Sequence, residues 1–325
     1  MNRIVLITVV LTFAAALPSR AEMREVPLHG ESVVRFATLE ESVKLLGQRD
    51  VFIQAMSRFD RQSRLGVAGE PTEDELLRFV TAQAVAWDDK QIAFVTKTIE
   101  SIRGRLERLK IPFPRTVLFV QTTGKDEGEA AYCRSNAVIL PQRLLKSSGA
   151  DFERLVIHEL FHIVSRHAPE LRKSLYAVVG FHACHEIPLP ADLARRKITN
   201  PDAPNVDCYI ELKVDGRTLH ATPILFSSEQ NYDAEKGGSF FRSMQFRLLV
   251  IERSGDRWQP ALKDQQPELL DPKKTPAYQE RIGGNTGYII HPDEILADNF
   301  MHLVLRTATL PTPKIVDDMR TLLSP

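Results

Sequence analysis

Residues 158–162, with the sequence HELFH, constrain this chain more than any other feature of it. They lie in an apolar periodic stretch that predicts a helix over about residues 152–167, capped by Asp151. Residues four apart share one face of a helix, so His158 and His162 should point toward one place. The flanking residues are apolar, and burying two imidazoles and a carboxylate there without a partner is costly. A metal ion would supply that partner.

Glu159 has a suitable position for catalysis at such a metal. It follows His158 directly, so its carboxylate falls beside the histidine face and not on it. A carboxylate there can take a proton from an attacking water molecule, which is the general-base role in metal-assisted hydrolysis. The HExxH spacing is typical of zinc metallopeptidases, so we expect one Zn²⁺ per chain.

Together with a later segment, this motif resembles the gluzincin class of metallopeptidases. Residues 294–298 read EILAD, an ExxxD pattern in a helix that is expected to begin at Pro292. In gluzincins the glutamate is the third zinc ligand, and the aspartate accepts a hydrogen bond from a ligand histidine. The resemblance therefore implies these roles for Glu294 and Asp298, within an α+β, zincin-like fold.

Other third ligands fit the sequence less well. A metzincin site would need a glycine and a histidine where this chain has Ser165 and Ala168. The remaining alternatives either lie on the wrong part of the helical turn or lack a helical motif with an accompanying aspartate. These alternatives are His167, Glu170, His182, His185 and His291.

Hydrolysis also needs a donor that stabilises the oxyanion on the attacked carbonyl. Gluzincins commonly use a tyrosine or a histidine for this purpose. Tyr288 and His291 lie just before the predicted ligand helix, after a glycine-rich stretch, and are the catalytic candidates. An ordinary packing or surface role is an equal alternative for each. Tyr232 is a third choice.

The regions around the motif predict an α+β chain. Apolar runs at residues 117–120 and 130–140 predict strands before the histidine helix. In zincin folds an antiparallel edge strand in that place binds the substrate backbone by strand addition. The predicted regions are a signal peptide (1–21), an N-terminal helical region (22–112), a catalytic region (113–187), a β-rich insertion (188–280) and a C-terminal helical region with the third ligand (281–325).

The first residues indicate export. Arg3 precedes an apolar run over residues 4–17, and the segment ends with small residues spaced for cleavage after Ala21. The alternative is an uncleaved anchor, but the run is shorter than the roughly 20 residues that span a bilayer. We expect a periplasmic or secreted protein without stable membrane insertion after cleavage.

Charge and cysteine content narrow the partners further. Lysine and arginine total 42, as do aspartate and glutamate, and no basic stripe marks a nucleic-acid surface. In an oxidising compartment, Cys133, Cys184 and Cys208 would give one disulfide and one free thiol, with Cys184 and Cys208 the closer pair. No CxxC pair is present, which argues against a thiolate zinc site.

The sequence thus predicts an exported zinc peptidase acting on a peptide or protein substrate, with Glu159 as general base. One alternative is a zinc hydrolase of a non-peptide amide. Another is a zinc-stabilised binding protein, which would not need Glu159. A thiol hydrolase using Cys133 or the adjacent Cys184 and His185 lacks any supporting sequence context.

Overall fold

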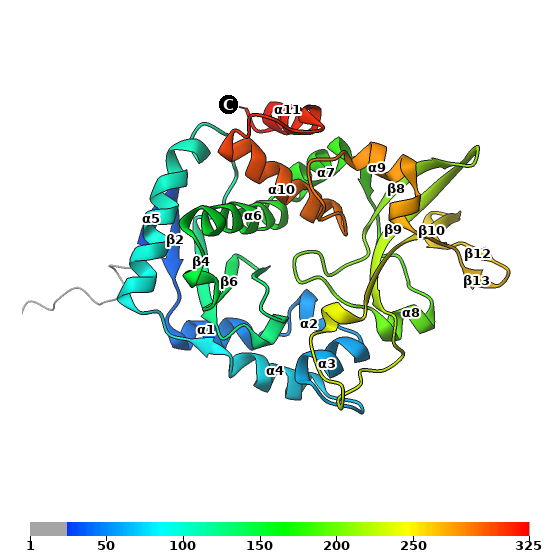
Figure 1. Cartoon of the computed structure of the whole chain (residues 1–325), viewed down its shortest axis with the longest axis horizontal. Helices are drawn as coiled ribbons and strands as arrows, with labels where there is room; N and C mark the ends of the chain where they lie inside the picture. The colour runs from blue at the N-terminus through cyan, green and yellow to red at the C-terminus, as the bar shows by residue number, and fades with distance from the viewer. Residues whose placement is uncertain (1–24, 325) are drawn as a thin grey trace, which may run out of the picture.

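The structure is a computed structural model of the chain, and it describes residues 25–324. The signal peptide predicted at residues 1–21 lies outside the described residues. Two separate sheets flank a group of helices (Figure 1), and this mixture of elements confirms the predicted α+β class.

The first sheet is a mixed sheet of six strands. They are β1 (Glu25–His29), β2 (Ser32–Phe36), β3 (Ala84–Val85), β4 (Thr116–Thr122), β5 (Tyr132–Arg134) and β6 (Ala137–Pro141). The order is β1-β2-β4-β6-β5, with β3 beside β4. β4 pairs in parallel with β2 and β6, whereas β5 runs antiparallel to β6 and forms one edge.

Two of the strand predictions can be compared with this sheet. The strand predicted at 117–120 lies within β4, which confirms it. The single strand predicted over 130–140 is wrong in detail, because this stretch is a hairpin of β5 and β6. Ser135 adopts a positive φ of 53° between them, a turn conformation that no continuous strand allows.

Four short helices follow the first two strands. They are α1 (Leu39–Leu46), α2 (Val51–Ala55), α3 (Arg58–Leu65) and α4 (Glu73–Thr81). Capping boxes begin α1, α3 and α4, with Thr38, Ser57 and Thr72 as the cap residues. The prediction of a helical region from residue 22 is wrong for β1 and β2, whose buried residues alternate with a period of two.

Longer helices form the centre of the molecule. They are α5 (Asp89–Leu106), α6 (Gly149–His167), α7 (Pro169–Val178), α10 (Pro292–Leu305) and α11 (Pro313–Leu322). α10 begins at Pro292 as predicted, and it lies against α6 (Figure 1). α6 begins earlier than predicted, because Ser148 is its N-cap and Asp151 lies in its first turn. Within residues 25–324, no helix has the length and apolar character needed to cross a bilayer.

The second sheet contains most of the β-rich region. Its strands are β7 (Phe181–Ala183), β8 (Cys208–Val214), β9 (Arg217–Ser227), β10 (Met244–Ser254), β11 (Arg257–Pro260) and β14 (Leu269–Leu270). The order is β11-β10-β9-β8-β7, with β14 beside β10. A separate hairpin, β12 (Leu262–Lys263) with β13 (Gln266–Pro267), and the helices α8 (Ala191–Arg196) and α9 (Pro276–Ile282) complete this part. The sheet begins at β7, ahead of the boundary predicted at residue 188.

One continuous apolar core joins the central helices to both sheets. It contains Phe119 of β4, Phe161 of α6, Phe300 of α10 and Ile210 of β8, each at most 1% exposed. The strands and helices that were predicted as separate regions therefore pack into one unit.

The cysteines do not form the predicted disulfide. Cys133, Cys184 and Cys208 are all free. Ala183 lies directly opposite Cys208 in the pairing of β7 with β8, so Cys184 is one position further along. Side chains alternate between the two faces of a sheet, and the thiols of Cys184 and Cys208 therefore point to opposite faces.

Candidate metal centre

His158, His162 and Glu294 come together where α6 and α10 pack against each other. The Oε2 atom of Glu294 lies 3.2 Å from Nε2 of His158 and 3.4 Å from Nε2 of His162. The side chains of His162 and Glu294 are almost fully buried, and that of His158 is 14% exposed. Helix α10 supplies the carboxylate 132 residues after His162, which only tertiary packing can arrange.

The donor set fits a zinc ion. Two imidazole nitrogens and one carboxylate oxygen are ligands that Zn²⁺ takes in catalytic sites. Tetrahedral ligands about 2.0–2.1 Å from the metal are roughly 3.3–3.4 Å apart, close to the separations found here. The Nε2 atom of His162 is buried and has no hydrogen-bond partner among the described residues. Such an atom is costly unless it has a ligand, and a cation at the centre of the three groups would satisfy it.

Each ligand imidazole is held from behind by a carboxylate. Nδ1 of His158 lies 2.9 Å from Asp298, which also accepts a hydrogen bond from the Thr286 hydroxyl. Nδ1 of His162 lies 2.7 Å from Asp293. These contacts leave both Nε2 atoms free to face Glu294, which is the orientation that metal binding requires.

Asp293 has a role that the sequence did not reveal. Its position in the first turn of α10 indicates only that its charge suits the positive end of the helix dipole. In the structure it is buried and also accepts hydrogen bonds from the hydroxyls of Ser165 and Tyr176. The only sequence signal for this role is its position directly before Glu294. The contact itself is not a local pattern, because His162 is 131 residues away.

The carboxylates around the site favour a positive charge on its imidazoles. Burial lowers the pKa of His158, but hydrogen bonds to Asp298 and Glu294 outweigh burial and raise the pKa to about 10. Burial raises the pKa of Glu294, but the two histidines, chiefly His162, hold it well below its usual range. Without a metal, the site therefore retains protons on its imidazoles, and a metal ion would displace them on binding.

Glu159 lies in the wall of the same cleft. It lines a cavity of about 430 Å³ together with His158, Glu294 and Tyr288. The thiol of Cys133 donates to its carboxylate at 3.3 Å. Burial raises the pKa of Glu159, which brings this carboxylate closer to the range in which a general base exchanges protons at neutral pH.

The structure separates the two oxyanion candidates. Tyr288 is 43% exposed in the cleft, and its ring stacks on His158 with the ring centres 6.1 Å apart. His291 is buried as the N-cap of α10, where its Nδ1 accepts from the Asp293 amide. Its Nε2 faces the Cys208 thiol at 3.6 Å, and burial lowers its pKa to about 4. His291 therefore packs behind the ligand helix and does not line the cleft.

The other candidate residues also lie away from the three ligands. Tyr232 packs on Phe59, and its hydroxyl donates to the Gly238 carbonyl. The alternative third ligands His167, Glu170, His182 and His185 are exposed.

A loop that the sequence did not mark contributes polar groups to the site. The Asn200 amide donates to the Oε1 atom of Glu294 at 2.6 Å. Asp202 lines the cleft beside Glu159 and accepts a hydrogen bond from the Cys133 amide at 2.8 Å. Burial raises the pKa of Asp202 to about 7. This loop lies in an irregular stretch without a motif, so no sequence pattern indicated it.

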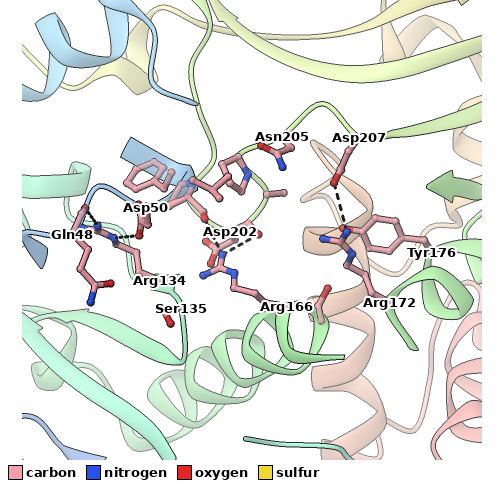
Figure 2. Close-up of a pocket in the computed structure, with 16 residues that line it drawn as sticks. Gln48, Asp50, Arg134, Ser135, Arg166, Arg172, Tyr176, Asp202, Asn205 and Asp207 are labelled. Atoms are coloured by element: carbon pink, nitrogen blue, oxygen red, sulfur yellow. Dashed lines mark hydrogen bonds and ion pairs between the residues drawn. The ribbon is translucent and has the colours of Figure 1, made fainter. Parts of the chain in front are cut away.

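A further cavity, of about 370 Å³, is lined in part by residues 201–205 of the chain, which continue this loop (Figure 2). It contains three arginines, but all of them are engaged: Arg134 with Asp50, Arg166 with backbone carbonyls including that of Pro201, and Arg172 with Asp207. These contacts tie the loop to α6 and α7. The cavity is thus a junction that positions Asp202, and its cations are not free to bind an anion.

Comparisons of the chain with models of known families, with curated proteins and with solved structures find no match. The functional assignment therefore rests on the chemistry of the site.

Proposed function

We propose that this protein is a zinc-dependent peptidase with His158, His162 and Glu294 as the metal ligands. The main support is the convergence of the three donor atoms, with Oε2 of Glu294 3.2 Å from Nε2 of His158 and 3.4 Å from Nε2 of His162. Nε2 of His162 is buried and makes no hydrogen bond within the described residues. A bound zinc ion would polarise the attacked carbonyl and make a water molecule more acidic. Thiolate chemistry is not favoured, because burial raises the pKa of the Cys133 thiol well above its usual range.

Two side chains of the cleft then have complementary roles. Glu159 accepts the proton of the attacking water and passes it to the leaving amine, since its carboxylate faces the cleft next to the ligands. Tyr288 donates its phenol proton in a hydrogen bond to the developing oxyanion, because its ring stands over His158 at the open side of the site. His291 has no part in this proposal.

An unpaired stretch of backbone just before the edge strand β5 favours a peptide substrate. β5 is the edge strand of the first sheet, and the outer backbone groups of Cys133 are taken by Asp202 and Arg166. Ala131 lies two residues before Cys133. In extended backbone, residues two apart direct their N–H and C=O groups to the same side, so those of Ala131 face the same edge. Its N–H and C=O have no hydrogen-bond partner in the described part of the chain. A peptide could therefore pair with Ala131, in the zincin-like manner of strand addition.

Metal content and cleavage of a peptide library test the proposal. Wild type should hold one zinc ion per chain and cleave peptides in a zinc-dependent way. Glu159→Gln should keep the zinc and lose at least about 1000-fold in kcat, since the base is removed without disturbing the ligands. Glu294→Ala should lose the metal. Glu170→Gln, on an exposed glutamate of α7, is the matched control and should resemble wild type.

The outcomes separate the alternatives. Zinc binding without cleavage of any peptide would favour a hydrolase of a non-peptide amide or a zinc-stabilised binding protein. Absence of zinc binding by the full chain would refute the metal site itself.

We also propose that the enzyme is exported, on the basis of the basic, apolar and small-residue segments within residues 1–21. N-terminal sequencing of the protein recovered outside the cytoplasm should begin at Glu22. Retention of Met1 in a cytoplasmic product would contradict export.

A further inference from the structure

A mainly apolar cavity of about 230 Å³ lies next to the catalytic cleft. It is bounded by the stretch before β5, the loop after α8, and the segments around β9 and the start of β10. We call it the apolar pocket and define it by the side chains Ile198, Leu225, Phe240, Phe241, Met244 and Ile290.

The apolar pocket is continuous with the cleft. Ala130, Ala131, Asp202 and Tyr288 line both cavities. The two alanines carry only a methyl group each, so on their side of the boundary no long side chain separates the pocket from the cleft. A peptide whose backbone pairs with Ala131 would therefore have one of its side chains next to the pocket entrance.

The polar groups of the pocket wall are already engaged. Glu127 is ion-paired with Arg64, the Thr199 hydroxyl donates to Asp60, and the Asn200 amide donates to Glu294. Asp202 and Tyr288 lie at the boundary with the cleft and are shared with the proposed catalytic groups. A charged side chain in this pocket would lose water without gaining a partner, whereas an apolar one would gain by burial.

The walls of the pocket are fixed in place by one buried cation. The Arg64 guanidinium lies 4.6 Å from the centre of the Phe240 ring. It also pairs with the Glu127 carboxylate and donates to the Thr199 carbonyl at 3.2 Å. The three wall segments that contain Phe240, Glu127 and Thr199 are thereby joined to α3. The pocket is therefore formed before any ligand binds.

We infer that the apolar pocket binds one bulky apolar side chain of the substrate, such as leucine or phenylalanine, and sets the cleavage specificity. This inference rests on the proposed peptidase function. The pocket contains aromatic, methionine and aliphatic groups on several sides, which favours a branched or aromatic side chain over alanine.

Binding to an inactive form tests the inference without relying on catalysis. The zinc-loaded, full-chain Glu159→Gln variant is titrated with blocked peptides that differ at one scanned position, carrying alanine, leucine, phenylalanine, tryptophan, lysine or glutamate. At one position, leucine or phenylalanine should bind about 10- to 100-fold more tightly than alanine. Lysine and glutamate should bind no better than alanine.

Pocket variants identify where the preference arises. Met244→Trp in the same background narrows the pocket and should reduce the preference for phenylalanine over alanine about 10-fold. Leu262→Trp, on an exposed residue of β12, should leave the preference unchanged. Ile290→Ala enlarges the pocket and should shift the preference toward tryptophan. This enlargement provides the test even if Met244→Trp fails to fold.

The inference and the proposed function fail in different ways. Cleavage of peptides by wild type without any apolar preference in binding would overturn the pocket assignment and leave the peptidase standing. An apolar preference that responds to Met244 or Ile290, in a protein that cleaves no peptide, would support the pocket and overturn peptide hydrolysis. A preference that neither variant alters would also overturn the pocket assignment.

Discussion

Asp293 orients the proposed ligand His162 and is itself fixed by the Ser165 and Tyr176 hydroxyls. We predict that Asp293→Asn weakens zinc binding by about 10- to 100-fold, because an amide is a poorer acceptor for the imidazole N–H. Competition with a chelator of known affinity measures the change. Asp318→Asn, on the exposed face of α11, is the matched control. An unchanged zinc affinity would mean that Asp293 serves only to pack α10 against α7.

Cys133 contacts the carboxylate of Glu159, the proposed general base. Its thiol donates to Glu159, and burial keeps it protonated because the pKa is raised. We predict that Cys133→Ala lowers kcat about 10-fold while zinc content stays at one per chain, since only the orientation of the base is lost. Cys133→Ser keeps a donor and should recover most of the activity. Equal kcat in the alanine variant would refute the positioning role.

The sequence predicted the site residues that belong to local patterns, and it missed those that do not. His158 and His162 lie four residues apart, so their spacing alone predicts a shared face with Glu159 beside it. Glu294 and Asp298 form a second local pattern, and only the resemblance linked it to the first. Asn200 and Asp202 had no such pattern, because their role arises from a loop that folds back onto both helices.

At the scale of elements, α3 is joined to two active-site loops through Arg64. This residue is 5% exposed and pairs with Asp60 and Glu127. We predict that Arg64→Met lowers the free energy of unfolding by about 3–5 kcal/mol, because two buried carboxylates lose their cation. Chemical denaturation measures the loss. Arg103→Met, which breaks an exposed pair with Glu107, should cost less than about 1 kcal/mol.

The Arg64→Met variant also tests whether Arg64 holds the wall of the apolar pocket in place. If Arg64→Met destabilises the protein as little as Arg103→Met does, the ion pairs of Arg64 with Asp60 and Glu127 do not hold the pocket wall in place. If stability falls as expected, the Glu159→Gln, Arg64→Met double variant should also lose its preference for apolar peptides, since the segments around Glu127 and Thr199 are released together.

The sequence was a better guide to helices than to sheets. α10 begins where its pattern predicted, because a proline start is a local signal. β1 and β2 were missed, although Val26, Leu28, Val34 and Phe36 are buried at alternate positions. Both strands are short. β1 pairs with β2 in a hairpin, but β2 pairs with β4 some 80 residues later, and local periodicity does not reveal that contact.

At the scale of the whole molecule, the predicted regional boundaries do not coincide with the packing. The core that contains Phe161 of α6 also contains Val34 of β2 and Leu212 of β8. Phe300 of α10 lies in the same core, so all four regions predicted after the signal peptide share a core with the helices that carry the proposed metal ligands. Composition shifts along the chain mark changes of secondary structure here, and they do not mark independent cores.

Zinc should accordingly stabilise the molecule as one unit. The ligands join α6 to α10, and both helices lie in the shared core, so binding to the folded state alone shifts the unfolding equilibrium of the whole chain. At a free zinc concentration of about 1000 times Kd, we expect a gain of about 4 kcal/mol and a rise in Tm on the order of 5–10 °C. Calorimetry with and without a chelator should give one transition in both states. In Glu294→Ala, zinc should have no such effect. A second transition that zinc does not move would mean that part of the chain unfolds independently, contrary to the continuous core.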